Sequence, residues 1–396
     1  MVNEEIIKLV TPVVVIVIYL FFYSKRYNIF PIIPQLLILS IALFSSNFQW
    51  IYRILGQGII LLFILYAYFY KKYKLKTDYS KIFLCFLCFI FVSYIGNAIV
   101  KDSYVTSILN YISITLTVIP YVQICKQNVV KREVFRLFEF LGICLSIVAF
   151  VEYFATSSRV EVTFSNSNYL SFFLIVSLIC SCSLYSKNKK IYRLLYVLIM
   201  LIGIILTGSR TTFLLSILAI LFLLFNSKNF LKFLLPAAFV YIVCLPLFSE
   251  ILQSRYKSIS DDASVDARIE IFETSKNIIR DHPINGIGYA QFSNQYKKYL
   301  PVNTGFSFLI YSYDEIVTHN DFLRIIDELG CIAFLISLYF IVSLFVHIIK
   351  NEGLNNFYFC MLFIICIFSF THNNLNSFLP WFFIALISDT FSKKNI

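Results

Sequence analysis

Arg210 is the residue of this chain whose type and position most clearly suit chemistry. It follows the turn Thr207-Gly208-Ser209, which lies between two apolar runs. A guanidinium at such a turn presents a planar fork of donors, and that geometry suits a phosphate group. The alternative is an arginine that extends toward lipid headgroups. The turn therefore predicts a phosphate-binding arginine at the membrane surface.

A second polar segment begins at Arg159 and continues to Asn166 and Asn168. The asparagine amides are suited to hydrogen-bonding sugar hydroxyls. Asparagine is also a preferred residue immediately before the first turn of a helix. Local spacing leaves both interpretations of the two asparagines open.

His319 opens a polar stretch that contains Asn320 and Glu328. The pKa of histidine lies near working pH, so the imidazole is able to take a proton from an acceptor hydroxyl. A helix N-terminus would lower that pKa and keep the ring neutral. The alternatives are a capping or interface role for His319 and, for Glu328, an ion pair with Arg324 one turn earlier.

No metal or cofactor is expected. Asp261 and Asp262 form a plain polar turn, and the sequence shows no acidic cluster suited to Mg²⁺. The ten cysteines all lie in or at the edge of apolar runs, which argues against a disulfide framework.

The elements that position these residues are membrane spans. Of the 396 residues, 59% are hydrophobic and 14% are charged, whereas soluble domains carry roughly a quarter charged residues. A mean hydropathy of +0.79 excludes a water-soluble surface. The net charge of +11 is interpreted as topological, and no nucleic-acid partner is expected.

The sequence predicts an all-α polytopic transmembrane bundle of about 12–13 spans. The predicted spans are residues 6–23, 29–46, 50–70, 82–99, 108–125, 134–155, 167–185, 191–207, 211–225, 233–248, 322–346, 357–371 and 377–391. If the second and third runs form one hairpin that does not cross twice, the N-terminus moves inside and the count falls to the lower value.

Basic residues give the orientation. Alternate short loops and ends hold twenty Lys and Arg residues on one side and five on the other. The richer side is cytoplasmic, so the polar segment 249–321 lies outside the cell membrane. The chain thus divides into an N-terminal bundle, 1–248, the long outer loop, 249–321, and C-terminal spans, 322–396.

The long outer loop carries an amphipathic stretch between Asp266 and Arg280. Ile269, Phe272 and Ile279 fall near one face of a helix there, and charged residues occupy the remainder. We expect an interfacial helix that lies over the mouth of the bundle.

Four motifs, in this order, resemble the O-antigen ligase and polymerase family of membrane proteins. They are Arg159 with Phe164-Ser165-Asn166-Ser167-Asn168; Thr207-Gly208-Ser209-Arg210; Arg268 and Phe272 with Pro283, Gly286 and Gly288; and His319-Asn320 with Glu328 and Gly330. Ser167 stands where the family usually has proline, and Phe272 where it has tryptophan.

The resemblance implies an enzyme that acts on undecaprenyl-pyrophosphate-linked oligosaccharide at the outer face of the cytoplasmic membrane. By this resemblance, Arg210 and His319 are catalytic. Substrate-binding roles fall to Arg159, Arg268, Asn166, Asn168, Asn320 and Glu328. Expected partners are the lipid-linked oligosaccharide, membrane lipids, a flippase and a chain-length regulator.

Three functions remain open. A Wzy-type polymerase of O-antigen or capsule repeat units is preferred over a WaaL-type ligase, which would transfer finished glycan to lipid A core. A flippase or transporter is disfavoured, because such proteins usually show two similar halves, and no internal repeat is visible.

Overall fold

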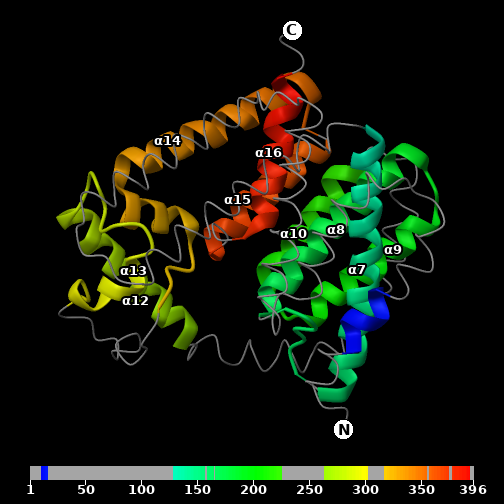
Figure 1. The fold of residues 1–396 in the computed structure, drawn as a ribbon, viewed down its shortest axis with the longest axis horizontal. Helices are drawn as coiled ribbons and strands as arrows, with labels where there is room; N and C mark the ends of the chain where they lie inside the picture. Colours follow the sequence, from blue (N-terminus) through cyan, green and yellow to red (C-terminus); the bar gives the residue numbers. More distant parts are fainter. Residues whose placement is uncertain are drawn as a thin grey trace, which may run out of the picture. The chain divides into compact units, whose positions relative to one another are not determined.

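The computed structural model describes residues 10–16, 128–156, 158–164, 166–224, 263–301, 316–354, 356–373 and 377–392. Throughout these ranges the regular structure is helical, without strands (Figure 1), which confirms the predicted all-α fold. The predicted spans from 29 to 125 and at 233–248 lie outside the described residues.

The described helices fall into two compact units. The first contains α7 (Asn128–Thr156), α8 (Ser167–Asn188), α9 (Tyr192–Leu206), α10 (Arg210–Leu224) and the first half of α15 (Phe357–Thr371). The second contains α12 (Ala263–Asp281), α13 (Phe292–Gln295), the 3₁₀ turn η2 (Tyr296–Lys298), nearly all of α14 (Asp321–Glu352), the rest of α15 and α16 (Phe378–Ser392).

Helix α8 is the centre of the first unit. It packs against α7, α9 and α10 and is buried along most of its length. Small residues let the neighbouring helices approach closely, because a Cβ added at Gly142 would lie 2.6 Å from Ser177 Cβ. The helix ends at Asn188. Its C-cap, Lys189, donates its N–H to the Tyr185 carbonyl and then turns the chain away with a left-handed φ of 52°.

Within the described residues, three helices are long and apolar enough to cross a membrane: α7 from Lys131 onward, α8 and α14. The shorter apolar helices are α9, α10, α15 and Leu379–Ser388. The observed bounds follow the predicted spans closely, and α15 matches its predicted range of 357–371 at both ends.

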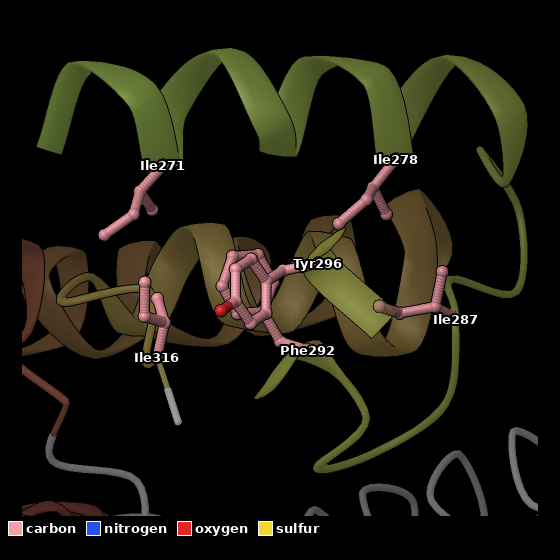
Figure 2. Packing of buried hydrophobic residues seen from close by; sticks show 6 residues of the cluster. All are labelled: Ile271, Ile278, Ile287, Phe292, Tyr296 and Ile316. Carbon is pink, nitrogen blue, oxygen red and sulfur yellow. The ribbon is translucent and has the colours of Figure 1, made fainter. Parts of the chain in front are cut away.

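An apolar cluster joins α12 to the loop that follows it in the second unit. Figure 2 shows Ile271 and Ile278 of α12 pointing toward Ile287, Phe292, Tyr296 and Ile316, all of them buried. Two residues of the predicted apolar face stay outside this cluster, since Ile269 is 39% exposed and Phe272 is 47% exposed. An interfacial helix would present such side chains to lipid, so the interfacial placement stays a prediction.

Polar side chains on the buried face of α12 also find partners within the second unit. The Thr274 hydroxyl donates to the Glu270 carbonyl at 2.7 Å, and the Ser275 hydroxyl donates to Asp327 Oδ2 at 2.6 Å. Satisfied hydroxyls of this kind cost little to bury, so hydrophobic spacing alone did not identify the buried side.

Helix α14 breaks at Gly330, where φ is 84° and ψ is 175°. The loop after α12 crosses the break. There, Ile287 N–H donates to the Asp327 carbonyl at 2.8 Å, and Gly288 N–H donates to the Glu328 carbonyl at 3.0 Å. Backbone carbonyls that the interrupted helix leaves without partners are thereby satisfied.

Replacement of Gly330 by alanine is expected to destabilise the second unit by about 3 kcal/mol or more, because this backbone conformation is essentially restricted to glycine. In addition, the new Cβ would lie 1.8 Å from the Ile284 carbonyl oxygen. Thermal unfolding of the detergent-purified protein measures the effect. Gly353→Ala is the control: φ is 78° there and nothing lies within 4 Å, so its cost is about 1 kcal/mol. Equal losses in both variants would contradict the account.

Candidate functional site

The first unit brings Arg159 to the turn that precedes Arg210. Arg159 Nε donates to the Thr207 carbonyl at 2.8 Å, and Arg159 Nη2 donates to Asn168 Oδ1 at 3.1 Å. Gly208 has a φ of +66°, and a Cβ there would lie 3.3 Å from Arg159 Nε. The Arg159 side chain therefore lies against the glycine turn whose backbone leads into Arg210.

A chain of buried hydroxyls holds this turn against the start of α8. Thr212 Oγ1 lies 2.9 Å from both Ser209 Oγ and Ser171 Oγ. Ser171 Oγ in turn donates to the Asn168 carbonyl at 2.7 Å. These bonds fix the first turn of α10, and with it the backbone of Arg210, which is half-buried.

The two asparagines have different roles in the structure. Asn166 is the N-cap of α8, and its side-chain oxygen accepts from Asn168 N–H at 2.8 Å. Asn168 instead turns its side-chain oxygen to Arg159. The side-chain oxygen of Asn166 thus serves as a helix cap, as one of the two interpretations predicted, whereas Asn168 orients the guanidinium of Arg159.

Glu152 holds the loop that carries Arg159, and sequence reasoning missed it. Its carboxylate is buried in the last turns of α7 and accepts from the N–H groups of Glu161 and Val162, each at 2.9 Å. Val162 has a left-handed φ of 54°, which these two bonds help to maintain. The available signal was an acidic residue inside a predicted span, where ionisable groups are costly and usually have a purpose.

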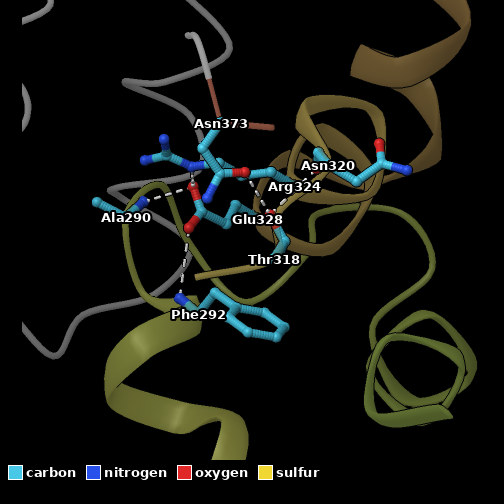
Figure 3. A network of polar contacts seen from close by, with 7 residues as sticks. All are labelled: Ala290, Phe292, Thr318, Asn320, Arg324, Glu328 and Asn373. Atoms are coloured by element: carbon cyan, nitrogen blue, oxygen red, sulfur yellow. Dashed lines mark hydrogen bonds and ion pairs between the residues drawn. The ribbon is translucent and has the colours of Figure 1, made fainter. Parts of the chain in front are cut away.

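In the second unit, the Glu328 carboxylate is the centre of a polar network (Figure 3). Its Oε2 accepts from Arg324 Nε at 3.0 Å and from Ala290 N–H at 2.8 Å, and its Oε1 accepts from Phe292 N–H at 3.4 Å. Only 3% of the residue is exposed. The ion-pair alternative therefore describes Glu328 better than a substrate contact does.

Arg324 also lies against the ring of Tyr289, with 5.4 Å between the guanidinium carbon and the ring centroid. This is a cation–π distance. Burial raises the pKa of the Tyr289 hydroxyl to about 12, so the phenol stays neutral. The loop from 282 to 291 is thus attached to α14 by charge, by an aromatic ring and by its backbone.

His319 lies immediately before the cap of α14. Asn320 Oδ1 accepts from Phe322 N–H at 2.9 Å and from Leu323 N–H at 3.1 Å, so Asn320 rather than His319 caps the helix. Partial burial, followed by the positive charge of Arg268, lowers the pKa of the His319 imidazole. The direction is the expected one, but the causes differ from the predicted helix terminus.

Arg268 lies on the exposed side of α12. The helix is anchored to the start of α14 by the bond from Ser275 Oγ to Asp327 Oδ2. Asp327 is fully buried, and sequence reasoning missed both partners. The anchor fixes the helix that bears Arg268 against the one that follows His319.

These features define a class of protein: a helical membrane protein with an arginine after a glycine turn and a histidine before a capped helix. Residues 195–338 match the family model described as O-antigen ligase, which confirms the resemblance to the O-antigen ligase/polymerase family. The match contains Arg210, Arg268 and His319, whereas Arg159 lies before it. No curated protein matches the chain. Members of the family are glycosyltransferase-like ligases and polymerases, and residues 195–338 of the chain are similar to them.

Glu152→Gln should lower the stability of the first unit by about 1–3 kcal/mol, because an amide nitrogen would face a buried N–H that has lost its acceptor. The apparent melting temperature of purified protein measures this loss. Glu161→Gln makes the same chemical change on the loop without altering the Glu152 carboxylate. The assigned role is wrong if Glu161→Gln costs as much.

Arg268→Gln is expected to raise the pKa of His319 toward its ordinary value, because a nearby positive charge that disfavours the imidazolium is removed. The ring would then be protonated over a wider range of acidic pH. The pH dependence of His319 carbethoxylation by diethyl pyrocarbonate, followed by mass spectrometry, reports this pKa. Arg280→Gln, an exposed position later on α12, serves as the control and should leave the curve in place.

Proposed function

We propose that the chain is a Wzy-like polysaccharide polymerase that joins undecaprenyl-pyrophosphate-linked repeat units on the outer face of the cytoplasmic membrane. The observation that carries this proposal is the turn at Gly208, where the Arg159 side chain contacts the backbone that leads to Arg210. Guanidiniums suit a diphosphate, because each presents several donors in a rigid fork, and we propose that those of Arg159 and Arg210 bind one.

The proposed reaction is an inverting transfer that needs no metal. The acceptor hydroxyl oxygen attacks the anomeric carbon of the donor sugar, and His319 takes the hydroxyl proton. The bond from that carbon to the pyrophosphate breaks, and its electron pair leaves with undecaprenyl pyrophosphate. The resemblance to the family implies that Arg159, Arg210 and Arg268 bind this leaving group and stabilise its developing charge.

A low pKa supports the role of His319 as the base. An imidazole must be neutral to accept a proton, and partial burial together with Arg268 favours the neutral form. Asn168 and Asn320 are proposed to contact the glycan through their amino groups, because their side-chain oxygens are engaged by Arg159 and by the first turn of α14.

A ligase is the second candidate, because the matching family model is described as O-antigen ligase. Both enzymes would use the same donor chemistry and differ in the acceptor. Deletion of the gene, followed by electrophoresis of the cell's glycans, separates them. Single repeat units on the lipid would indicate a lost polymerase, whereas long glycan retained on the lipid would indicate a lost ligase.

Arg210→Ala and His319→Ala are each expected to abolish long-chain polysaccharide in a complemented deletion strain, while membrane levels of the protein stay normal. The reason is loss of charge stabilisation in one variant and of the base in the other. Arg280→Ala, at an exposed ion pair with Asp281, is the control and should restore wild-type glycan. Long glycan from both active-site variants would show that the proposed mechanism is wrong.

A further inference from the structure

His319 has a left-handed backbone with a φ of 50°. Residues that carry a Cβ adopt this conformation at an energetic cost, and such residues persist only where the surroundings hold them. On the C-terminal side, the Asn320 cap fixes the chain to α14. The remaining question is what holds the backbone on the N-terminal side.

Thr318 supplies that second anchor. It is 4% exposed, and its hydroxyl lies 3.0 Å from Asn373 Oδ1 and 3.1 Å from the Asn320 carbonyl. A single hydroxyl proton shared between two acceptors is a common three-centre arrangement. Figure 3 shows the Thr318 and Asn373 side chains pointing toward each other, with Asn320 beside them.

Asn373 comes from a distant part of the sequence, just after α15 ends at Thr371. The rings of Phe322 on α14 and Phe370 on α15 also approach, with 6.2 Å between centroids. The end of α15 is thus held to the start of α14 by an aromatic contact and by one side-chain hydrogen bond. That hydrogen bond is made by Thr318, the residue immediately before His319.

We propose that Thr318 and Asn373 are positioning residues that hold the His319 backbone in its left-handed conformation and so aim the imidazole at the acceptor hydroxyl. Neither residue is placed in contact with substrate, and both act through His319. The inference rests on the proposed function in one respect, since that function makes His319 the base. Asn373 lies outside the region matched by the family model, 195–338, so the match does not assign it this role.

The test uses a pair of disruptive variants and a pair of conservative ones. Thr318→Val removes the hydroxyl at nearly constant shape, and Asn373→Leu removes the acceptor. Thr318→Ser keeps the hydroxyl, and Asn373→Asp keeps an oxygen acceptor. Loss of one hydrogen bond of this kind corresponds to roughly a fivefold shift in the population of the held conformation. We therefore expect about a fivefold loss of long-chain glycan in each disruptive variant, with substantial rescue by the conservative ones.

The double variant Thr318→Val/Asn373→Leu should lose no more than the worse single variant, because the two residues act through one bond. Losses that multiply would show that they act independently, and the proposal would be overturned.

A second measurement does not need the substrate. In the purified full-length protein, the rate at which diethyl pyrocarbonate modifies His319 at neutral pH is followed by mass spectrometry. His282, whose Nε2 lies 2.8 Å from the Tyr299 hydroxyl in the same unit, is the internal reference. We expect the His319 rate to rise severalfold in Thr318→Val and Asn373→Leu, to return in the conservative variants, and to leave the His282 rate unchanged.

Unchanged His319 rates, or equal changes at both histidines, would overturn the positioning role. Failure of the proposed function is separate and would be seen as normal glycan in the deletion strain. In that case an altered His319 rate would still establish that Thr318 and Asn373 position this residue.

Discussion

The buried carboxylate of Glu328 is the interaction on which the second unit depends. It accepts from Arg324 and from two backbone N–H groups of the loop and of α13. Buried non-helical backbone is tolerated only where its polar groups find hydrogen-bond partners. Glu328 and the broken end of the helix at Gly330 provide those partners, so the loop from 282 to 292 has one defined path against α14.

The first unit solves the same problem with different residues. Glu152 accepts from the loop that bears Arg159, and a chain of hydroxyls fixes the turn that bears Arg210. In both units, buried side chains satisfy the backbone, and the residues proposed for chemistry are attached to that backbone. Glu328 belongs to the first group, because it holds the backbone of the loop, whereas His319, in the same motif, is proposed for chemistry.

Much of the helical pattern could be predicted from sequence, because burial in a bundle or in lipid requires long apolar runs. The bounds of α15 followed from that requirement, and the turns that carry Arg159 and Arg210 were found as polar breaks between apolar runs. Glu152, Asp327, Thr318 and Asn373 could not be assigned, because their roles depend on partners far away in the chain. The side of α12 that is buried in the protein could not be assigned for the same reason, since Ser275 lies there through its bond to Asp327. Gly330 belongs to one of the four motifs, but the sequence did not predict that the helix breaks there. The break depends on the close approach of the loop at Ile284, which only the structure shows.

The central claim is that arginines and a histidine transfer glycan from a lipid pyrophosphate without a metal. The most direct test supplies the purified protein in lipid nanodiscs with undecaprenyl-pyrophosphate-linked oligosaccharide in the presence of EDTA. The account predicts that glycan lengthens and that one undecaprenyl pyrophosphate is released for each unit added. Transfer that requires an added divalent cation, or glycan growth without release of undecaprenyl pyrophosphate, would contradict it.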